Sequence, residues 1–116
     1  MFDFIAFVEL AANLARRGDE AADRSAIGRA YYAAFHACRD HLDAGGERVS
    51  RGSSGHGEVL DNLSNLDLEA GQNLRRLHRM RRAADYEAVR PIDAVVEAKT
   101  AVSLARLVVS AVDRLA

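Results

Sequence analysis

The residues best suited to chemistry lie in one stretch, Arg24–Leu42, with the sequence RSAIGRAYYAAFHACRDHL. At about 100° per residue, its functional side chains gather on one helical face. They are Arg29, Tyr32, His36, Arg39 and Asp40. A histidine can move a proton near neutral pH, and a guanidinium can stabilise a phosphorane-like transition state. Arg29 and His36 lie about two turns apart on that face, an arrangement that fits RNA transesterification without a metal.

A second candidate site lies further along the chain, in and after the basic segment Leu74–Arg82. His78, Arg81 and Asp85 fall within one narrow helical strip at spacings of three and four residues. A carboxylate one turn from an arginine orients the guanidinium, which then suits bidentate capture of phosphate. The alternative is an ordinary row of surface ion pairs, each contributing tenths of a kcal/mol, and the spacing alone favours it.

No metal site and no cofactor are expected. Cys38 and His41 can share a helical face, but His36 points away from them, and zinc needs three or four convergent ligands. Cys38 is expected to be a small residue of the core. The glycines at 52–57 have neither the preceding strand nor the following lysine of a phosphate-binding loop.

The composition predicts one domain, residues 1–116, located in the cytoplasm. The chain is 49% hydrophobic, and its single cysteine excludes a disulfide within the chain. A net charge of −1 argues against binding nucleic acid through overall charge, so any attraction to RNA must be local. The apolar start Met1–Ala15 is interrupted by Asp3 and Glu9, so neither a signal peptide nor a membrane partner is expected.

The elements that position these residues are predicted to be helices in an all-α, up-and-down bundle of four to five helices. The expected helices are Met1–Arg17, Asp19–Asp43, Glu58–Leu68, Glu69–Glu87 and Pro91–Leu115, with a loop over Glu47–Gly57. Opposite its polar face, the second helix has an apolar stripe. The stripe consists of Ile27, Tyr31, Ala34, Phe35, Cys38 and Leu42. Tyr32 on the polar face and a strongly aliphatic last helix predict a homodimer.

Several stretches together resemble the HEPN superfamily, and in particular its small stand-alone prokaryotic members. RAYYAAFHA, preceded by Ser25 and Ala26, is similar to the signature helix of that family. GHGEV at 55–59 resembles its Gly/Ser loop ending in a histidine that opens the next helix, and RRAADY at 81–86 resembles its Arg-x-x-Ala-Asp-Tyr element. With the last Ala/Val-rich helix, the resemblance covers nearly the whole chain.

The resemblance implies a dimerising helical bundle, and active HEPN members are metal-independent endoribonucleases. Many are toxins neutralised by a nucleotidyltransferase antitoxin, sometimes through modification of a tyrosine beside the catalytic motif. That motif is an arginine followed four to six residues later by a histidine. Here Asp85 and Tyr86 follow Arg81 instead. Two other Arg–His pairs are present, Arg29 with His36 and Arg51 with His56. We interpret the spacing of the second pair, which lies in the expected Gly/Ser-rich loop, as coincidental.

Two functions therefore stay open. In the first, the chain is a ribonuclease toxin of a toxin–antitoxin or nucleotidyltransferase-associated system. Its catalytic residues would be Arg81 and Tyr86, or Arg29 and His36. Its RNA contacts would run through Arg81, Asp85, Arg82 and His78. In the second, the chain is a noncatalytic helical partner that binds and regulates a nucleotidyltransferase.

Overall fold

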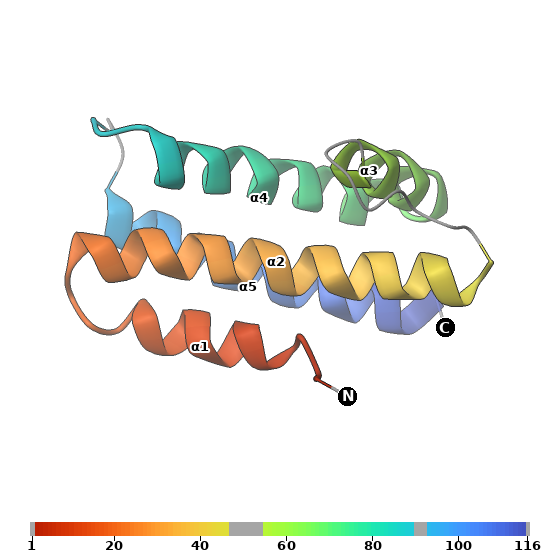
Figure 1. The fold of residues 1–116 in the computed structure, drawn as a ribbon, viewed down its shortest axis with the longest axis horizontal. Helices are drawn as coiled ribbons and strands as arrows, with labels where there is room; N and C mark the ends of the chain where they lie inside the picture. The colour runs from red at the N-terminus through yellow and green to blue at the C-terminus, as the bar shows by residue number, and fades with distance from the viewer. Residues whose placement is uncertain (1, 47–54, 90–92, 116) are drawn as a thin grey trace.

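The described residues form five helices and contain no strand, which confirms the all-α prediction. A computed structural model describes residues 2–46, 55–89 and 93–115. Its helices are α1 (Ala6–Leu14), α2 (Glu20–Ala44), α3 (Gly55–Leu66), α4 (Leu68–Tyr86) and α5 (Ala94–Leu115) (Figure 1). None of these helices is long and apolar enough to cross a membrane.

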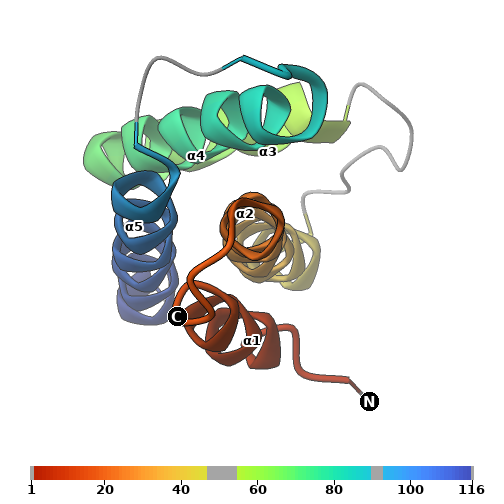
Figure 2. The ribbon, with the colours of Figure 1, turned by 90° about the vertical axis from the view of Figure 1, so that its left-hand side faces the viewer.

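Helix α2 is the centre of the bundle and contacts each of the other four helices. It lies beside α5 along the long axis of the molecule, with α1 on one side and α4 on the opposite side (Figures 1 and 2). Helix α3 packs on α4 and also reaches α2. Side chains from α2, α3 and α4 can therefore converge on one place.

The ends of α2 follow from its sequence and lie within a residue of the prediction. The Asp19 side chain accepts a hydrogen bond from the backbone N–H of Ala22 at 2.7 Å, so it caps the helix. Glu20 and Asp23 add negative charge to the first turn, where the helix dipole favours it. Gly46 follows the last turn with a φ of 88°, a conformation that glycine adopts without a steric penalty.

The buried face of α2 is the predicted one. Its buried side chains include Ile27, Tyr31, Ala34, Phe35, Cys38 and Leu42. The facing stripe of α5 is rich in alanine and includes Ala98, Ala101 and Ala105, which are fully buried. Small side chains let the axes of two helices approach closely. Val95 and Val96 of this aliphatic helix are exposed, because the buried face of α5 is the one that carries the alanines.

The predicted third helix, Glu58–Leu68, is wrong at both its first and its last residue. Helix α3 begins at Gly55 rather than Glu58 and ends at Leu66, so His56 lies in a helical turn and not in a loop. Leu68 belongs to α4, because the Asp67 side chain accepts a hydrogen bond from the N–H of Ala70 at 3.0 Å and caps that helix. The remainder of the predicted loop, 47–54, lies outside the described residues.

The first and last helices are shorter than predicted. Helix α1 begins at Ala6 after a turn, and it ends at Leu14 rather than Arg17. Helix α5 begins at Ala94, and the predicted start at Pro91 lies outside the described residues.

Gly71 does not break α4 but lets α3 approach it closely. A Cβ atom at this position would lie 2.1 Å from Oγ and 2.7 Å from Cα of Ser64, a residue of α3. Only a residue without a side chain fits against that backbone. This close approach holds the two helices that bring His56 and His78 together.

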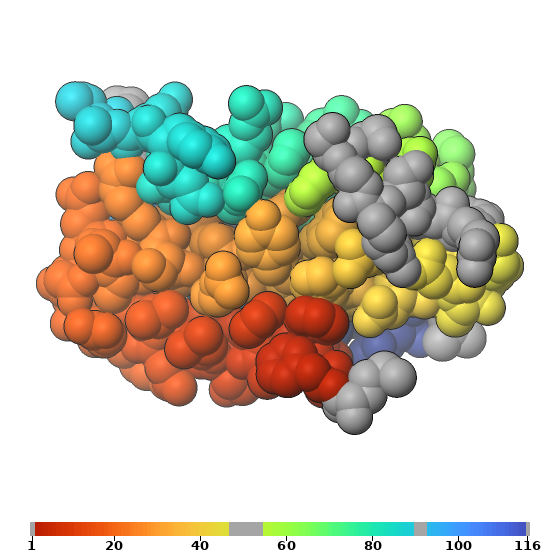
Figure 3. All heavy atoms as spheres, in the orientation of Figure 1, coloured from red at the N-terminus to blue at the C-terminus, as the bar shows by residue number. Residues whose placement is uncertain are grey.

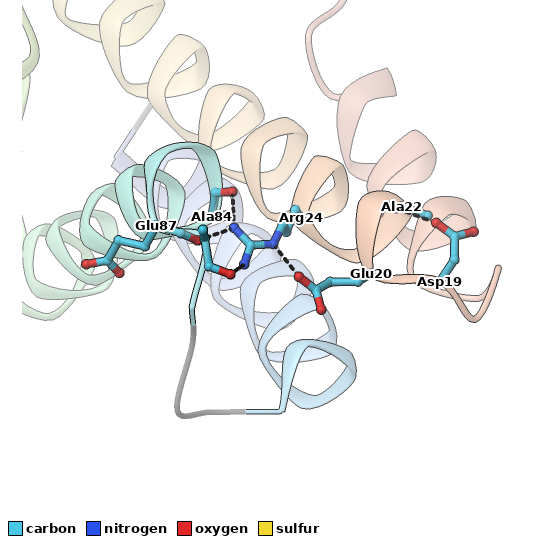
Figure 4. Close-up of polar contacts among 7 residues, drawn as sticks. Asp19, Glu20, Ala22, Arg24, Ala84 and Glu87 are labelled. Atoms are coloured by element: carbon cyan, nitrogen blue, oxygen red, sulfur yellow. Dashed lines mark hydrogen bonds and ion pairs between the residues drawn. The ribbon is translucent and has the colours of Figure 1, made fainter.

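Arg24 ties the start of α2 to the end of α4. Its Nη1 donates to the carbonyl oxygens of Ala84 at 2.9 Å and Glu87 at 2.6 Å, and its Nη2 lies 3.4 Å from that of Ala88 (Figure 4). Its Nε donates to Glu20 at 2.8 Å. The last four carbonyl groups of an α-helix have no partner within the helix. Arg24 thus caps α4 from outside and holds its last turn, which carries Asp85 and Tyr86.

Candidate functional site

Two histidines from different helices stand together over the middle of α2. The rings of His56, in the first turn of α3, and His78, in α4, have centroids 5.4 Å apart and planes 17° apart. Both side chains are half-buried. Histidine is the side chain that most often transfers protons near neutral pH, so this pair is a candidate for acid–base chemistry.

The floor beneath the pair is made by aromatic side chains of α2. The Tyr31 ring lies 5.3 Å from His78 and 5.8 Å from His56, and the Phe35 ring lies 4.6 Å from His56. The Tyr31 hydroxyl forms a short hydrogen bond with Nδ1 of His56. The histidines are therefore held by packing from below and open towards solvent above.

Arg81 lies beside the histidines and is fixed by contacts on three sides. Its Nε forms an ion pair with Asp85 at 3.0 Å, without the alignment of a full hydrogen bond. Its guanidinium carbon lies 5.4 Å from the ring centroid of Tyr32 and 6.0 Å from that of Tyr86. A carboxylate on Nε fixes the plane of the guanidinium and leaves the two Nη atoms as an edge that could bind phosphate.

These groups line an open groove of about 400 Å³, made by His56, His78, Arg81, Arg82 and Tyr86. Tyr86 is 75% exposed, so its ring is available for stacking. In the space-filling view, atoms of α2 reach the surface between α4 and the N-terminal segment (Figure 3). Two arginines, two histidines and an exposed aromatic ring in one groove suit a phosphate group joined to a base.

Burial and nearby positive charges lower the pKa of both imidazoles, which favours their neutral form near pH 7. Partial burial lowers the pKa of His56, and the charges of Arg81 and Arg39 lower it further. Partial burial also lowers the pKa of His78, with further contributions from His56, Arg82 and Arg81. A neutral imidazole has a lone pair that can accept a proton, so the pair is ready to act as a base.

The other candidate residues, the strip formed by Arg29 and His36 on α2, lie outside the groove. The His36 ring stacks on Phe4 with centroids 3.8 Å apart, and an Arg39 Nη2 lies 3.0 Å from its Nδ1. The guanidinium carbon of Arg29 lies 5.0 Å from the centroid of the Phe7 ring. Aromatic side chains of the N-terminal segment therefore pack against both residues, which stay partly exposed.

Tyr32 connects the two strips. The guanidinium carbon of Arg29 lies 5.6 Å from its ring centroid, and that of Arg81 lies 5.4 Å away. The structure thus brings the predicted residues His78, Arg81, Arg82, Asp85 and Tyr86 together. It places Arg29 and His36 next to this group, on the far side of Tyr32.

The sequence reasoning missed His56 and Tyr31. We expected His56 in a loop and Tyr31 only in the core, where its ring is indeed fully buried. A signal for Tyr31 was present, because a buried tyrosine hydroxyl needs a hydrogen-bond partner. That partner is 25 residues away in the chain, so helical periodicity could not identify it.

The described residues contain no group of three or more histidine, cysteine, aspartate or glutamate side chains able to hold a metal ion. In comparisons with known proteins, no family model, curated protein or solved structure matches this chain.

Proposed function

We propose that this chain is a HEPN-like, metal-independent endoribonuclease that binds and cleaves RNA in the groove between α3 and α4. The observation that carries the proposal is the His56–His78 ring pair beside Arg81. This groove combines proton transfer, phosphate binding and a stacking ring. The resemblance of the chain to small HEPN proteins supports the same function.

The proposed reaction is a transesterification within RNA. The ribose 2′-oxygen bonds to phosphorus while the bond from phosphorus to the next 5′-oxygen breaks. One imidazole of the pair accepts the 2′-hydroxyl proton, and the 5′-oxygen takes a proton from solvent water. Arg81 stabilises the negative charge of the phosphorane-like transition state. The products are a 2′,3′-cyclic phosphate and a 5′-hydroxyl end.

The substrate fits best as single-stranded RNA. The exposed Tyr86 ring offers a stacking surface for an unpaired base, and Arg82 adds positive charge at the rim. Because the net charge of the chain is −1, binding should depend on this local group of cations and weaken with salt.

The test is cleavage of a single-stranded RNA oligonucleotide in the presence of EDTA, with analysis of the product ends. We expect His78→Gln to slow cleavage by about 10²-fold or more and Arg81→Ala by about 10²–10³-fold. Arg79→Ala is the matched control, since Arg79 lies on the same helix, is exposed and does not line the groove.

His36→Ala distinguishes the two strips. If the groove is the site, this variant retains cleavage, because His36 does not line the groove and its ring stacks on Phe4. Loss of cleavage with His36→Ala but not with His78→Gln would move the site to α2. RNA binding without cleavage by the wild-type chain would support a noncatalytic partner of a nucleotidyltransferase instead.

The proposal extends to the assembly in which the protein works. It describes an up-and-down bundle that pairs as a homodimer. Val96 and Leu107 on α5 are 56% and 53% exposed, and a dimer interface on this face of α5 would bury them. Sedimentation as a monomer at micromolar concentration would contradict the dimer and leave the proposal for the groove unchanged.

We also propose that the protein is located in the cytoplasm, because its Cys38 is a free, buried thiol and a reducing compartment keeps thiols in that state.

A toxin role predicts growth arrest when the chain is expressed alone in bacteria. It also predicts rescue when a nucleotidyltransferase encoded beside it is expressed with it. Normal growth of cells that contain the folded chain would contradict the toxin role.

A further inference from the structure

The hydrogen bond between Tyr31 and His56 distinguishes the two histidines of the groove. Tyr31 is fully buried, and its hydroxyl meets Nδ1 of His56. A hydroxyl has one proton to donate, and leaving that proton unpaired in the interior is unfavourable. In the part of the chain that the structure describes, His56 is the partner of this hydroxyl.

The direction of this hydrogen bond follows from burial. Burial raises the pKa of Tyr31 above its usual value, so the phenol keeps its proton at neutral pH. The pKa of His56 is lowered, so its ring is neutral there. A neutral imidazole carries one N–H and one lone pair. When Tyr31 donates to Nδ1, the lone pair is on Nδ1 and the ring proton is on Nε2.

We propose that Tyr31 is a positioning residue that holds His56 as the Nε2–H tautomer, so that His56 serves as a hydrogen-bond donor in the groove and His78 serves as the base. This assignment rests on the proposed ribonuclease function for its catalytic part. The tautomer itself is a property of the folded chain without substrate.

The assignment gives each group one task in the reaction. His78 accepts the proton of the 2′-hydroxyl while the 2′-oxygen bonds to phosphorus and the 5′-oxygen departs with a proton from water. The Nε2–H of His56 donates to a non-bridging phosphoryl oxygen, where negative charge develops, and transfers no proton. A neutral imidazole can stabilise a developing oxyanion in this way.

The tautomer is measured directly by two-bond ¹H–¹⁵N correlation spectra of the full-length protein with ¹⁵N-labelled histidine. We expect Nδ1 of His56 to show the shift of an unprotonated nitrogen and Nε2 that of a protonated one. In Tyr31→Phe, the two shifts should move towards an average of both tautomers. Tyr32→Phe is the matched control, since it removes a neighbouring hydroxyl and should leave the His56 shifts unchanged. A wild-type His56 protonated on Nδ1, or shifts that Tyr31→Phe does not change, would overturn the assignment.

The roles are separated by glutamine variants. Glutamine keeps an N–H donor but cannot act as a base near neutral pH. His56→Gln should therefore retain partial cleavage and the fall in rate as the base becomes protonated at low pH, whereas His78→Gln should lose that pH dependence. Tyr31→Phe should reduce kcat about tenfold with little change in KM, and tenfold corresponds to about 1.4 kcal/mol. Loss of the low-pH limb in His56→Gln rather than His78→Gln would overturn the roles.

Failure of the two proposals gives different results. If the wild-type chain does not cleave RNA while the spectra show the Nε2–H tautomer, the positioning role of Tyr31 stands and the ribonuclease function fails. If the chain cleaves RNA and His56 is protonated on Nδ1, the ribonuclease function stands and the assignment of roles fails.

Discussion

Replacing Arg24 by methionine should loosen the end of α4 without disturbing the core. Arg24 donates to the carbonyl oxygens of Ala84 and Glu87 and reaches that of Ala88 (Figure 4). Its side chain is 18% exposed, so part of its stem is packed. Methionine keeps that apolar stem and removes the guanidinium, so the loss of stability reports the hydrogen bonds rather than the packing.

The expected loss is about 2 kcal/mol. A hydrogen bond from a charged group contributes about 1.5–3 kcal/mol when it is sheltered, which applies to the partly buried contact with Ala84. The contacts with Glu87 and Ala88 are exposed and add less. For a chain of this size, about 2 kcal/mol corresponds to roughly 8 °C in Tm. Urea unfolding followed by circular dichroism measures the free energy directly.

Glu20→Gln is the matched control for this prediction. It removes the exposed ion pair with Arg24 and one negative charge from the first turn of α2, so we expect a loss of about 1 kcal/mol or less. Hydrogen exchange should locate the effect of Arg24→Met in the last turn of α4, which carries Tyr86. A free energy of unfolding within about 0.5 kcal/mol of wild type, or faster exchange spread evenly over all helices, would refute this account of Arg24.

Three further predictions concern stability. Leu77→Ala should cost about 2–5 kcal/mol in urea unfolding because Leu77 is fully buried, while Arg79→Ala on the exposed side of α4 should change stability by about 0.5 kcal/mol or less. Gly71→Ala should destabilise the fold because its Cβ would overlap α3, whereas Gly28→Ala, with open space around the new Cβ, should gain up to about 1 kcal/mol. Between pH 6.5 and the lowered pKa values of the two groove histidines, the unfolded chain binds more protons. The free energy of unfolding should therefore fall as the pH falls through this window, and replacing both histidines by glutamine should remove that fall.

The part of the site that lies on one helix could be predicted from the sequence. Arg81 and Asp85 are four residues apart, and a helix places such residues side by side whatever it packs against. The two faces of α2 were predictable for the same reason, because apolar and polar residues alternate with the helical period. Periodicity assigns faces within a helix, and the structure agrees with it for α2 and α4.

The convergence of helices could not be predicted in this way. His56 meets Tyr31 and His78 only because α3 packs on α4 close to Gly71, and the sequence gives no distance between helices. The start of α3 was misplaced because glycines at 55 and 57 are typical of loops, yet both lie in its first turn, where tertiary packing outweighs propensity. The exposure of Val95 and Val96 could not be predicted for a similar reason, since the aliphatic composition of the last helix does not show which of its faces meets a neighbouring helix.

Burial is the main cause of the lowered pKa of both groove histidines, and the arginine charges that lower it further are also the charges proposed to bind RNA. Arg81 lowers the pKa of both His56 and His78, and Arg82 lowers that of His78. A phosphodiester bound at Arg81 would cancel part of this positive potential, because a negative charge nearby favours the protonated imidazole. Before RNA binds, the lowered pKa therefore leaves the imidazoles free to accept a proton. Once a phosphodiester is bound, their pKa would rise, so an imidazole would keep the proton that it has accepted. A base needs both properties in that order, and under the proposed function Arg81 would contribute to both, because its charge acts on the two imidazoles and would bind the phosphate.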